Sequence, residues 1–449
     1  MEVLDLLSKT LSDDQIKLSQ EHRTAYSSDW SKIGSYNPLC ILFPKTEKDV
    51  INIILICNSK KYPVVISSGR TGLSGGAAVI GNEIVISLEK LNSNIKFDEL
   101  NHTIICDAGF TTHQVQEFAA AHGYYYPVDF SSAGSSLIGG NIATNAGGVR
   151  VLKFGSTADY VLGLNVVLGS GKLIQNISNL KKTAIGPKLY KNFIGSEGLF
   201  GIITKCSMKV VDALPELETL LFGFDDNDSL EVIQNFLLKE DLYLMEYFDK
   251  NSLDYSLSFL DTPKPFTKAY EHYILIDCKK NALNKIMESD LLLSIDSMDI
   301  IHSNSLQKSN NLKKFRMHIT ESISQYSPIK FDISIPLQKC AKFLNAIQSS
   351  FCNSFLSKNY ELIIFGHLGE GNFHVNIFGH DTNNKVGINE IVLNSVMKFS
   401  GSMSSEHGIG FLKKEYLEKS LSKDEITLLK ELKTIYDPNN ILNPYKFFS

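Results

Sequence analysis

The sequence predicts an α+β protein of at least two domains. A chain of 449 residues exceeds one ordinary hydrophobic core, so more than one domain is expected. Residues 36–212 are rich in Gly, Val and Ile and read as short strands separated by tight turns. Residues 213–400 alternate longer helical patterns with strand-like runs. We expect a helical segment over residues 1–35 and a separate C-terminal segment over 401–449.

The composition excludes several classes of function. A net charge of -5 argues against a nucleic-acid binder. The seven cysteines are widely spaced and form no CxxC pair, which predicts buried thiols in a reducing compartment. The first residues do not read as a signal peptide, and no stretch approaches the roughly 20 apolar residues of a membrane span. These observations predict a cytoplasmic protein without a transmembrane segment and leave peripheral membrane contact open.

Turn and cap signals place the elements of the first region. Residues 62–66 read as a buried strand that leads into a glycine loop, and Gly81-Asn82 reads as a hairpin turn between two apolar segments. Residues 103–107 read as another strand. Thr111 and Gln114 have the spacing of a capping box, which predicts a helix that ends before Gly123.

Further elements follow from the same signals. Two apolar runs, 161–168 and 172–177, flank Gly-Ser-Gly and predict a hairpin. In the second region, 273–278 and 331–335 read as strands. A helix is expected over 423–435, before two proline-containing stops.

Three glycine-rich segments point to a phosphate-containing cofactor. They span residues 67–76, 131–148 and 194–203. Dense glycines let backbone N–H groups approach a diphosphate closely, because no Cβ blocks the approach. None of the segments contains a P-loop GK[ST] motif, and the first loop lacks the GxGxxG spacing of a Rossmann helix. The cofactor is therefore expected to be held by a different fold.

His367 and His374 suggest one metal ion held across a β-hairpin. Residues 361–366 and 375–378 are strand-like, and the glycines between them provide a turn. If the two histidines are opposite each other, both imidazoles reach one ion. Glu406 is the candidate third ligand, which gives two histidines and one carboxylate with a position open for substrate.

Several segments together resemble the FAD-linked 2-hydroxy-acid dehydrogenases of the vanillyl-alcohol-oxidase type. They are the first glycine loop and residues 138–174, 193–205, 366–376, 404–410 and 437–444. The resemblance covers almost all of the chain from about residue 36 onward. It implies an FAD-binding domain of two α+β subdomains over 36–212, an α+β cap domain for substrate over 213–400, and a C-terminal segment that returns to the FAD domain and completes the active site.

The resemblance also implies which residues hold the flavin. Those near the diphosphate would be Gly69, Thr71, Gly72, Gly75 and Gly76. Those along the flavin would be Asp129, Ser135, Gly139, Asn141, Thr144, Asn145, Gly147 and Gly148, with Gly198 and Ile203 toward the nucleotide half. Arg70 departs from the small or amide residue usual in the family, and the sequence leaves open whether it faces solvent or neutralises phosphate. Neither long loop contains a His or Cys for covalent attachment, so non-covalent FAD is implied.

The reaction that the family carries out needs a base and an activated hydroxyl. The flavin takes the hydride, so the protein must orient the carboxylate and remove the hydroxyl proton. A divalent metal on His367, His374 and Glu406 would bind the hydroxyl and carboxylate oxygens. His407 would be the base and contact the substrate. Zinc is the preferred ion, with manganese, cobalt and iron left open.

Cations in the second region point to a diacid. Arg316 and Thr320 are expected on one face of a single amphipathic helix, and Lys330 lies just before a strand. These three residues resemble the D-2-hydroxyglutarate dehydrogenase branch of the family, where they would hold the distal carboxylate. Asn376 alternates with His374 along the strand and is expected to hydrogen-bond substrate.

The predicted function is therefore oxidation of D-2-hydroxyglutarate to 2-oxoglutarate with FAD and a metal. A dehydrogenase for D-lactate or another D-2-hydroxy acid stays open within the same class. A metallohydrolase and a non-catalytic flavoprotein subunit are the more distant alternatives. The sequence does not identify the electron acceptor, whether quinone, electron-transfer flavoprotein or cytochrome. It leaves open a homodimer and the reactivity of the reduced flavin with oxygen.

Overall fold

The computed structural model describes residues 2–34, 36–178, 184–295, 298–303, 305–379 and 384–448. The chain divides into two compact units. Unit 1 consists of Met1–Gly148, Gly155–Leu214 and Glu406–Ser449, and unit 2 of Val149–Phe154 and Pro215–Ser405.

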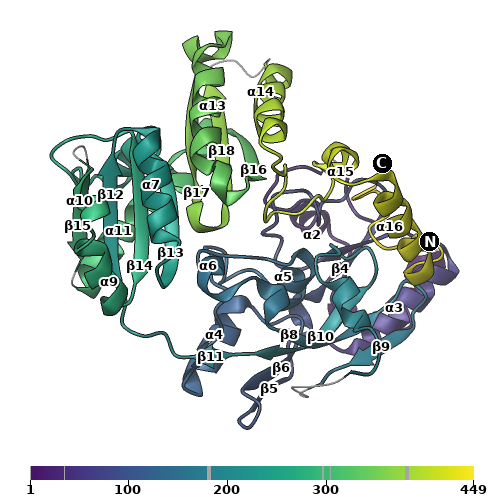
Figure 1. Ribbon diagram of the computed structural model, residues 1–449. Helices are drawn as coiled ribbons and strands as arrows, with labels where there is room; N and C mark the ends of the chain where they lie inside the picture. The colour runs from purple at the N-terminus through teal and green to yellow at the C-terminus, as the bar shows by residue number, and fades with distance from the viewer. Residues whose placement is uncertain are drawn as a thin grey trace. The chain divides into compact units, whose positions relative to one another are not determined.

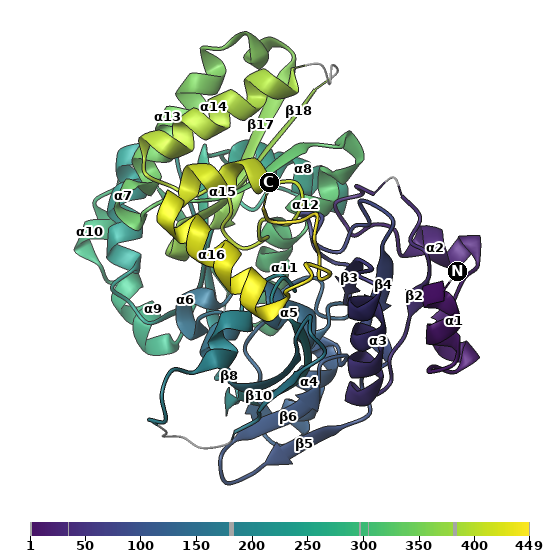
Figure 2. The same cartoon turned by 90° about the vertical axis from the view of Figure 1, so that its right-hand side faces the viewer.

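The first sheet of unit 1 is mostly parallel. Its order is β1 (Ile16–Lys17), β2 (Ile41–Leu42), β4 (Ile84–Ser87) and β3 (Val64–Ser67). Helix α3 (Glu47–Ser59) begins at a capping box of Thr46 and Asp49 and buries Val50, Ile53, Ile54 and Cys57. Helix α1 (Glu2–Ser8) packs against α3 (Figure 2).

The predicted hairpin turn at Gly81-Asn82 is wrong. Residues 77–80, directly before the predicted turn, form no strand, so β4 has no hairpin partner there. Strand β4 instead pairs in parallel with β3, with Val64 opposite Ile84 and Ser67 opposite Ser87. The long glycine loop carries the chain back along the sheet before β4 begins. The two strands therefore end at the same edge, which a hairpin would not allow.

The second sheet of unit 1 is antiparallel. Its order is β5 (Ile95–Asp98), β6 (Thr103–Asp107), β10 (Ile202–Lys209), β8 (Val161–Val167) and β9 (Leu173–Asn176). The predicted hairpin is confirmed as β8 and β9, and the predicted strand 103–107 is β6. Helix α4 (Thr112–Ala121) begins at the predicted capping box, with Thr111 and Gln114 bonded reciprocally. The other elements of unit 1 before residue 406 are α2 (Gln20–Ala25), β7 (Tyr124–Tyr125), α5 (Ile138–Thr144) and β11 (Val211–Asp212).

The C-terminal segment returns to the first sheet. Helices α15 (Lys414–Ser420) and α16 (Lys423–Tyr436) precede it. Leu442 then forms a parallel bridge with Val64 of β3. The side chain of Asn443 accepts a hydrogen bond from the Ile66 N–H at 3.1 Å. The last residues of the chain therefore support the strand that carries the first glycine loop.

Unit 2 contains one antiparallel sheet of seven described strands. Their order is β15 (Asp299–Ser303), β12 (Glu218–Phe224), β14 (His272–Cys278), β13 (Leu242–Asp249), β17 (Tyr360–His367), β18 (Asn372–Gly379) and β16 (Ile329–Ser334). The helices of this unit are α6 (Val151–Phe154), α7 (Asn227–Leu237), α8 (Lys250–Leu260), α9 (Lys280–Met287), α10 (Asp290–Leu293), α11 (Leu306–Met317), α12 (Ile319–Ser322), α13 (Cys340–Cys352) and α14 (Lys385–Lys398).

Helices α8, α11 and α12 share one apolar core with this sheet. Phe248, Leu275 and Ile363 from the strands pack with Leu312 and Phe315 from α11. A second group of helices, α7, α13 and α14, packs together, and Figure 1 shows α13 beside α14. The sheet face under α11 carries the polar residues of the candidate site.

Two local predictions need correction. The single amphipathic helix expected to carry Arg316 and Thr320 is broken, because α11 ends at Met317 and α12 begins at Ile319. Arg316 is buried while Thr320 is exposed, so the two residues do not share a face.

The expectation of buried thiols holds for six of the seven cysteines, all of which are free, but Cys352 is exposed.

Among the residues that the structure describes, no helix combines the length and the apolar character needed to cross a bilayer.

Candidate active site

The three glycine-rich segments come together in unit 1. A Cβ on Gly69 would lie 2.2 Å from the carbonyl oxygen of Ser135, so the first two loops touch through their backbones. A Cβ on Gly140 would lie 2.8 Å from Cβ of Ser68. The third segment joins them where the Glu197 N–H donates to the Ala143 carbonyl at 2.7 Å. Segments far apart in the sequence thus form one glycine-lined wall.

The polar residues of the second loop have structural partners within unit 1. The Asn141 side chain is buried and donates to Thr112 Oγ1 at 2.6 Å. The Thr144 hydroxyl donates to the Gly140 carbonyl at 3.1 Å. Asn145 adopts a left-handed conformation with φ of 50°, and its side chain accepts from the Ala158 N–H at 2.8 Å. These bonds fix the backbone that the resemblance assigns to the flavin.

The remaining predicted flavin residues lie around the same wall. A Cβ on Gly148 would lie 2.0 Å from the Asp129 carbonyl oxygen, which brings those two residues together. Gly198 has φ of 74° and packs against Asn443 and Ile66. Three more glycines have close neighbours: Gly139 packs on Ala108, Gly75 packs against Ile33 and Phe411, and Gly72 lies near Asp29. Ile203 is buried on β10, whereas Thr71 and Gly147 are partly exposed.

Several observations fit a diphosphate or ribose at this wall. No described atom lies within 4 Å of the position that a Cβ on Gly76 would take, so space is open beside the first loop. Ser67 and Ser87, paired at the ends of β3 and β4, have buried hydroxyls without a hydrogen-bond partner among the described residues. These donors suit the phosphate oxygens of FAD.

The Arg70 side chain stacks on an aromatic ring of unit 1. Its guanidinium lies 3.8 Å from the centroid of the Tyr26 ring and 3.9 Å from a carboxylate oxygen of Glu89. Its backbone has φ of 54°, and its carbonyl accepts from the Trp30 N–H. Stacking on Tyr26 therefore accounts for the arginine at this place in the loop.

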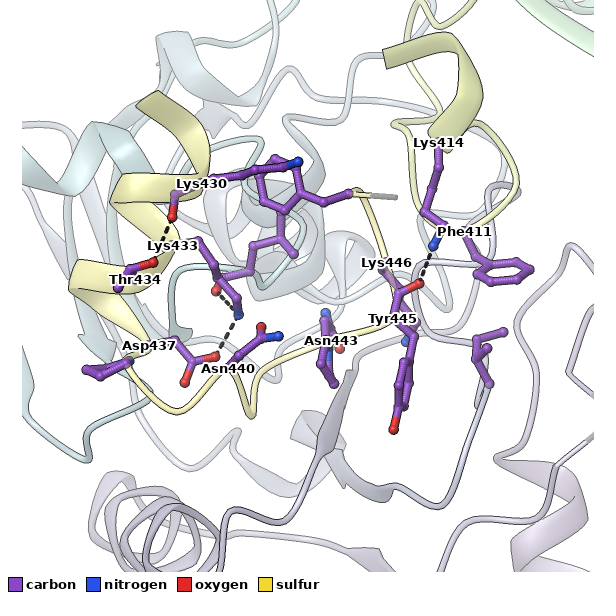
Figure 3. Close-up of a pocket in the computed structure, with 15 residues that line it drawn as sticks. Phe411, Lys414, Lys430, Lys433, Thr434, Asp437, Asn440, Asn443, Tyr445 and Lys446 are labelled. Atoms are coloured by element: carbon purple, nitrogen blue, oxygen red, sulfur yellow. Dashed lines mark hydrogen bonds and ion pairs between the residues drawn. The ribbon is translucent and has the colours of Figure 1, made fainter. Parts of the chain in front are cut away.

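A cavity of about 540 Å³ lies beside the C-terminal segment of unit 1 (Figure 3). Lys433 crosses its wall and donates to Asp437 Oδ2 at 2.6 Å and to the Leu199 carbonyl at 2.8 Å. Lys414 donates to the Tyr445 carbonyl at 2.9 Å. These bonds anchor the segment that supports β3. None of the predicted flavin residues lines this cavity, so we assign it no ligand.

The histidine pair is on one sheet face in unit 2, but its register differs from the prediction. His367 pairs with Asn372, and His374 pairs with Phe365, so the two histidines are diagonal rather than directly opposite. The turn is two residues shorter than direct pairing requires, because residues 368–371 separate the paired His367 and Asn372, whereas residues 368–373 would separate a directly paired His367 and His374. The ring centroids still lie 5.6 Å apart. Diagonal neighbours remain within reach of side chains of this length.

Glu246 on β13 is the polar centre of this face. Its Oε1 accepts from His367 Nδ1 at 2.6 Å, and its Oε2 lies 2.7 Å from Arg316 Nη2. The Arg316 guanidinium also lies 4.7 Å from the centroid of the Phe365 ring. Burial favours the neutral form of Glu246, but His367 and Arg316 outweigh that effect and lower its pKa. Glu246 is therefore an ionised carboxylate held in an apolar core.

Glu406 completes a cluster of possible metal ligands. It directly follows Ser405, whose N–H donates to Asp332 Oδ2 at 3.1 Å. One ligand atom each from His367, His374 and Glu406 lie within 4.8 Å of one another. The three predicted ligands are thus brought together, and two imidazoles with one carboxylate are a donor set that suits zinc.

His407 is positioned by the flavin loops of unit 1. The Ser74 hydroxyl donates to the His407 carbonyl at 2.9 Å. Glu197 accepts from the Ile409 and Gly410 N–H groups, both at 2.7 Å. His407 Nε2 lies 3.3 Å from Glu406 Oε1. The predicted base is therefore adjacent to the predicted metal ligand, and the glycine-rich segments hold its backbone.

The predicted substrate residues divide into two groups. Lys330 and Asn376 are register partners on β16 and β18, on the same face as His374. Asn376 is buried, and its side chain donates to the His374 carbonyl at 3.3 Å. Arg316 is buried against Glu246, and Thr320 is exposed on α12.

Two family models match the chain. A model described as an FAD binding domain matches residues 38–176, and one described as the C-terminal domain of FAD linked oxidases matches residues 215–447. The chain belongs to the FAD-linked oxidases. It is an FAD-dependent dehydrogenase of the vanillyl-alcohol-oxidase type, as the sequence motifs predicted.

Individual relatives of this FAD-linked oxidase agree with the family. The D-2-hydroxyglutarate dehydrogenase of Stutzerimonas stutzeri is 36% identical over 100% of this chain and 99% of its own. That of Xanthomonas citri is 33% identical over 94% of this chain and 92% of its own. A solved 4-ethylphenol oxidase from Gulosibacter chungangensis has a TM-score of 0.78 at 15% identity, covering 100% of this chain and 96% of that structure. The predicted α+β fold is confirmed.

Sequence reasoning missed four residues that organise the site of this FAD-linked oxidase. They are Ser74, Glu197, Glu246 and Asp332. Glu246 and Asp332 had a readable signal, because each is an acid within a strand whose neighbours are apolar. Such acids are rarely buried unless they are paired. Glu197 and Ser74 lie within glycine segments already singled out, but their partners near residue 410 could not be read from local sequence.

Proposed function

We propose that the protein oxidises D-2-hydroxyglutarate to 2-oxoglutarate, with FAD as hydride acceptor and a divalent metal, preferably zinc, as Lewis acid. The observation that carries this proposal is the ligand cluster of His367, His374 and Glu406, with Lys330 and Asn376 on the same sheet face as the two histidines. The names of the relatives from Stutzerimonas and Xanthomonas support the choice of substrate.

The two bound groups supply chemistry that side chains lack. When present, FAD accepts the hydride from Cα of the substrate, and a divalent cation lowers the pKa of the substrate hydroxyl. Every other requirement falls on the residues of the chain: binding the two carboxylates, orienting Cα and holding the hydroxyl proton.

His407 is the proposed base. As the Cα–H bond breaks with its electron pair, the hydroxyl proton passes to the imidazole, and a C=O bond forms. Ser74 holds the carbonyl of this histidine and Glu197 holds the N–H groups of Ile409 and Gly410 just after it, which limits the movement of His407 during the transfer. A base whose ordinary pKa is near 6.5 suits this step at neutral pH.

Lys330 is the proposed contact for the distal carboxylate. It is an exposed cation that is paired in register with Asn376, two residues from His374. Arg316 adds a second positive charge, and one side of its guanidinium is held by Glu246. A substrate with a second carboxylate gains from both cations, whereas D-lactate gains from neither.

Anaerobic reduction of the bound flavin tests the substrate assignment. D-2-hydroxyglutarate, L-2-hydroxyglutarate, D-lactate and D-glycerate are mixed separately with the protein, and loss of the visible flavin absorbance is timed. We expect rapid bleaching by D-2-hydroxyglutarate and much slower bleaching by the other three compounds. Faster reduction by D-lactate would assign the protein to the alternative branch. Equal reduction by the two enantiomers of 2-hydroxyglutarate would contradict the proposed site.

A further inference from the structure

The Glu246 carboxylate joins two parts of the site that the proposed function treats as separate. One oxygen accepts from His367, a proposed metal ligand, and the other pairs with Arg316, a proposed substrate cation. Glu246 and Arg316 are both buried, with relative exposures of 0% and 6%. A charged pair at this depth costs desolvation free energy and is weak evidence for a purely stabilising role.

The hydrogen bond to His367 defines which ring nitrogen carries a proton. An ionised carboxylate can only accept, so His367 Nδ1 must be the donor. A neutral imidazole with its proton on Nδ1 has its lone pair on Nε2. That nitrogen is then the one available to a metal ion. A carboxylate behind a metal-bound histidine also fixes the ring orientation and raises the basicity of the ligand.

Arg316 is the positively charged partner of Glu246 in this apolar core. Its guanidinium supplies a full positive charge 2.7 Å from Oε2 and stacks over Phe365. The ring of Phe365 in turn lies 5.2 Å from that of His374. The arginine is therefore held in place by the sheet, and the Glu246 carboxylate partly neutralises its charge.

From these contacts we propose that Glu246 is a positioning residue. Its hydrogen bond to Nδ1 orients His367 so that Nε2 binds the metal, and Arg316 is the counterion of the Glu246 carboxylate. This inference rests on the proposed function, because it requires a metal on His367. It adds a residue outside the ligand set and gives Arg316 a role besides substrate binding.

A matched control is present in the same sheet. Asp277 on β14 is also fully buried and pairs with a cation of α11, since its Oδ2 lies 2.7 Å from Lys313 Nζ. Its other oxygen accepts from the Thr219 hydroxyl at 2.7 Å. Asp277 pairs with no histidine in the described structure. Asp277→Asn thus removes a buried carboxylate under the same helix without touching the proposed ligands.

The test measures zinc binding rather than turnover. Metal-stripped, FAD-loaded wild type, Glu246→Gln and Asp277→Asn are dialysed against chelator-buffered zinc, and bound zinc and FAD are counted for each protein. We expect Glu246→Gln to weaken zinc binding by about 10- to 100-fold. Asp277→Asn should stay within about 2-fold of wild type, and FAD content should be unchanged in all three.

A double variant covers the case in which Glu246→Gln does not fold. Glu246→Gln with Arg316→Gln removes both charges, so neither is left buried and unpaired. It should show the same loss of zinc affinity. Zinc binding within about 2-fold of wild type in the Glu246 variants, or an equal loss in Asp277→Asn, would overturn the inference while leaving the metal site intact. A wild type that binds no zinc would overturn the inference together with the metal in the proposed function.

Discussion

Lys330 is the residue on which the choice between a diacid and a monoacid depends. We expect Lys330→Ala to raise KM for D-2-hydroxyglutarate by about 10- to 100-fold, because a charge-assisted hydrogen bond contributes roughly 1.5–3 kcal/mol. Turnover of D-lactate should change by less than about 2-fold, since D-lactate has no distal carboxylate.

The control for this variant is Lys314→Ala. Lys314 is an exposed lysine of α11 that we place in no binding role. Steady-state kinetics on both substrates compare the two variants. An equal effect of Lys330→Ala on both acids would remove Lys330 from the specificity argument.

Two glycines of the first loop make different predictions for FAD binding. Gly76 has open space beside it, so Gly76→Ala should leave the fold intact. The same change should weaken FAD binding, because the added methyl group would enter the space proposed for the cofactor. Gly69 touches the Ser135 carbonyl, so Gly69→Ala should separate the two loops and lower both the stability and the FAD content. Thermal melting and FAD counted per chain distinguish the two effects. Unchanged FAD affinity in Gly76→Ala would place the diphosphate elsewhere.

The role of the glycine loops could be predicted from the sequence, because a backbone that must approach a ligand or another loop closely leaves few alternatives to glycine. The two histidines and Glu406 could be named for a similar reason, since few side chains bind metals. Glu246 could not be assigned a role. Its partner His367 lies 121 residues away, and no local motif connects them.

At the scale of elements, the hairpin that carries the histidines shows what local patterns determine. The alternation of apolar residues predicted both strands and their shared face. The register was wrong, because a short 3-10 turn at Leu368–Glu370 shifts the pairing so that His367 faces Asn372. Turn conformation depends on backbone dihedrals that several sequences can adopt. The break between α11 and α12 at His318 was also missed, because it too depends on local backbone dihedrals.

Asp249, at the end of β13, gives the sheet of unit 2 a pH-dependent stability. Its carboxylate accepts from the Ser252 and Ile364 N–H groups, both at 2.8 Å, and burial raises its pKa to about 6. The unfolded value is near 3.9. The folded state therefore holds a proton that the unfolded state has released between these values. This contribution to stability is complete below about pH 4 and is lost as the pH rises through 6.

Asp249→Asn should remove this dependence. On going from pH 7 to pH 5, wild type should gain about 1 kcal/mol in the free energy of unfolding relative to the variant. Urea unfolding followed by circular dichroism at the two pH values measures the difference. A gap between the two proteins that is the same at both pH values would show that Asp249 does not titrate as described.

At the scale of the whole molecule, the sequence predicts the division into two regions but not the strand order within the second. The change in texture near residue 212 and the resemblance gave the two regions. The strand order of unit 2 could not be read, because β13 pairs with β17 across a long stretch of intervening chain. Long-range pairing is decided by the packing of many side chains, which no local window contains.

The same division predicts how the two bound groups behave when one is removed. The segments assigned to FAD all belong to unit 1, whereas both histidine ligands belong to unit 2. Removal of the metal with a chelator should therefore leave FAD bound. Flavin content and zinc content of the stripped protein check this directly.

The central claim is that a metal on His367, His374 and Glu406 is required for oxidation of the 2-hydroxy acid. The most direct measurement is anaerobic bleaching of the flavin by D-2-hydroxyglutarate in the stripped, FAD-loaded protein, before and after one equivalent of zinc is returned. We expect bleaching to be lost on stripping and restored by zinc in wild type, but not in His374→Ala. Bleaching at the same rate in the metal-free protein would contradict the claim.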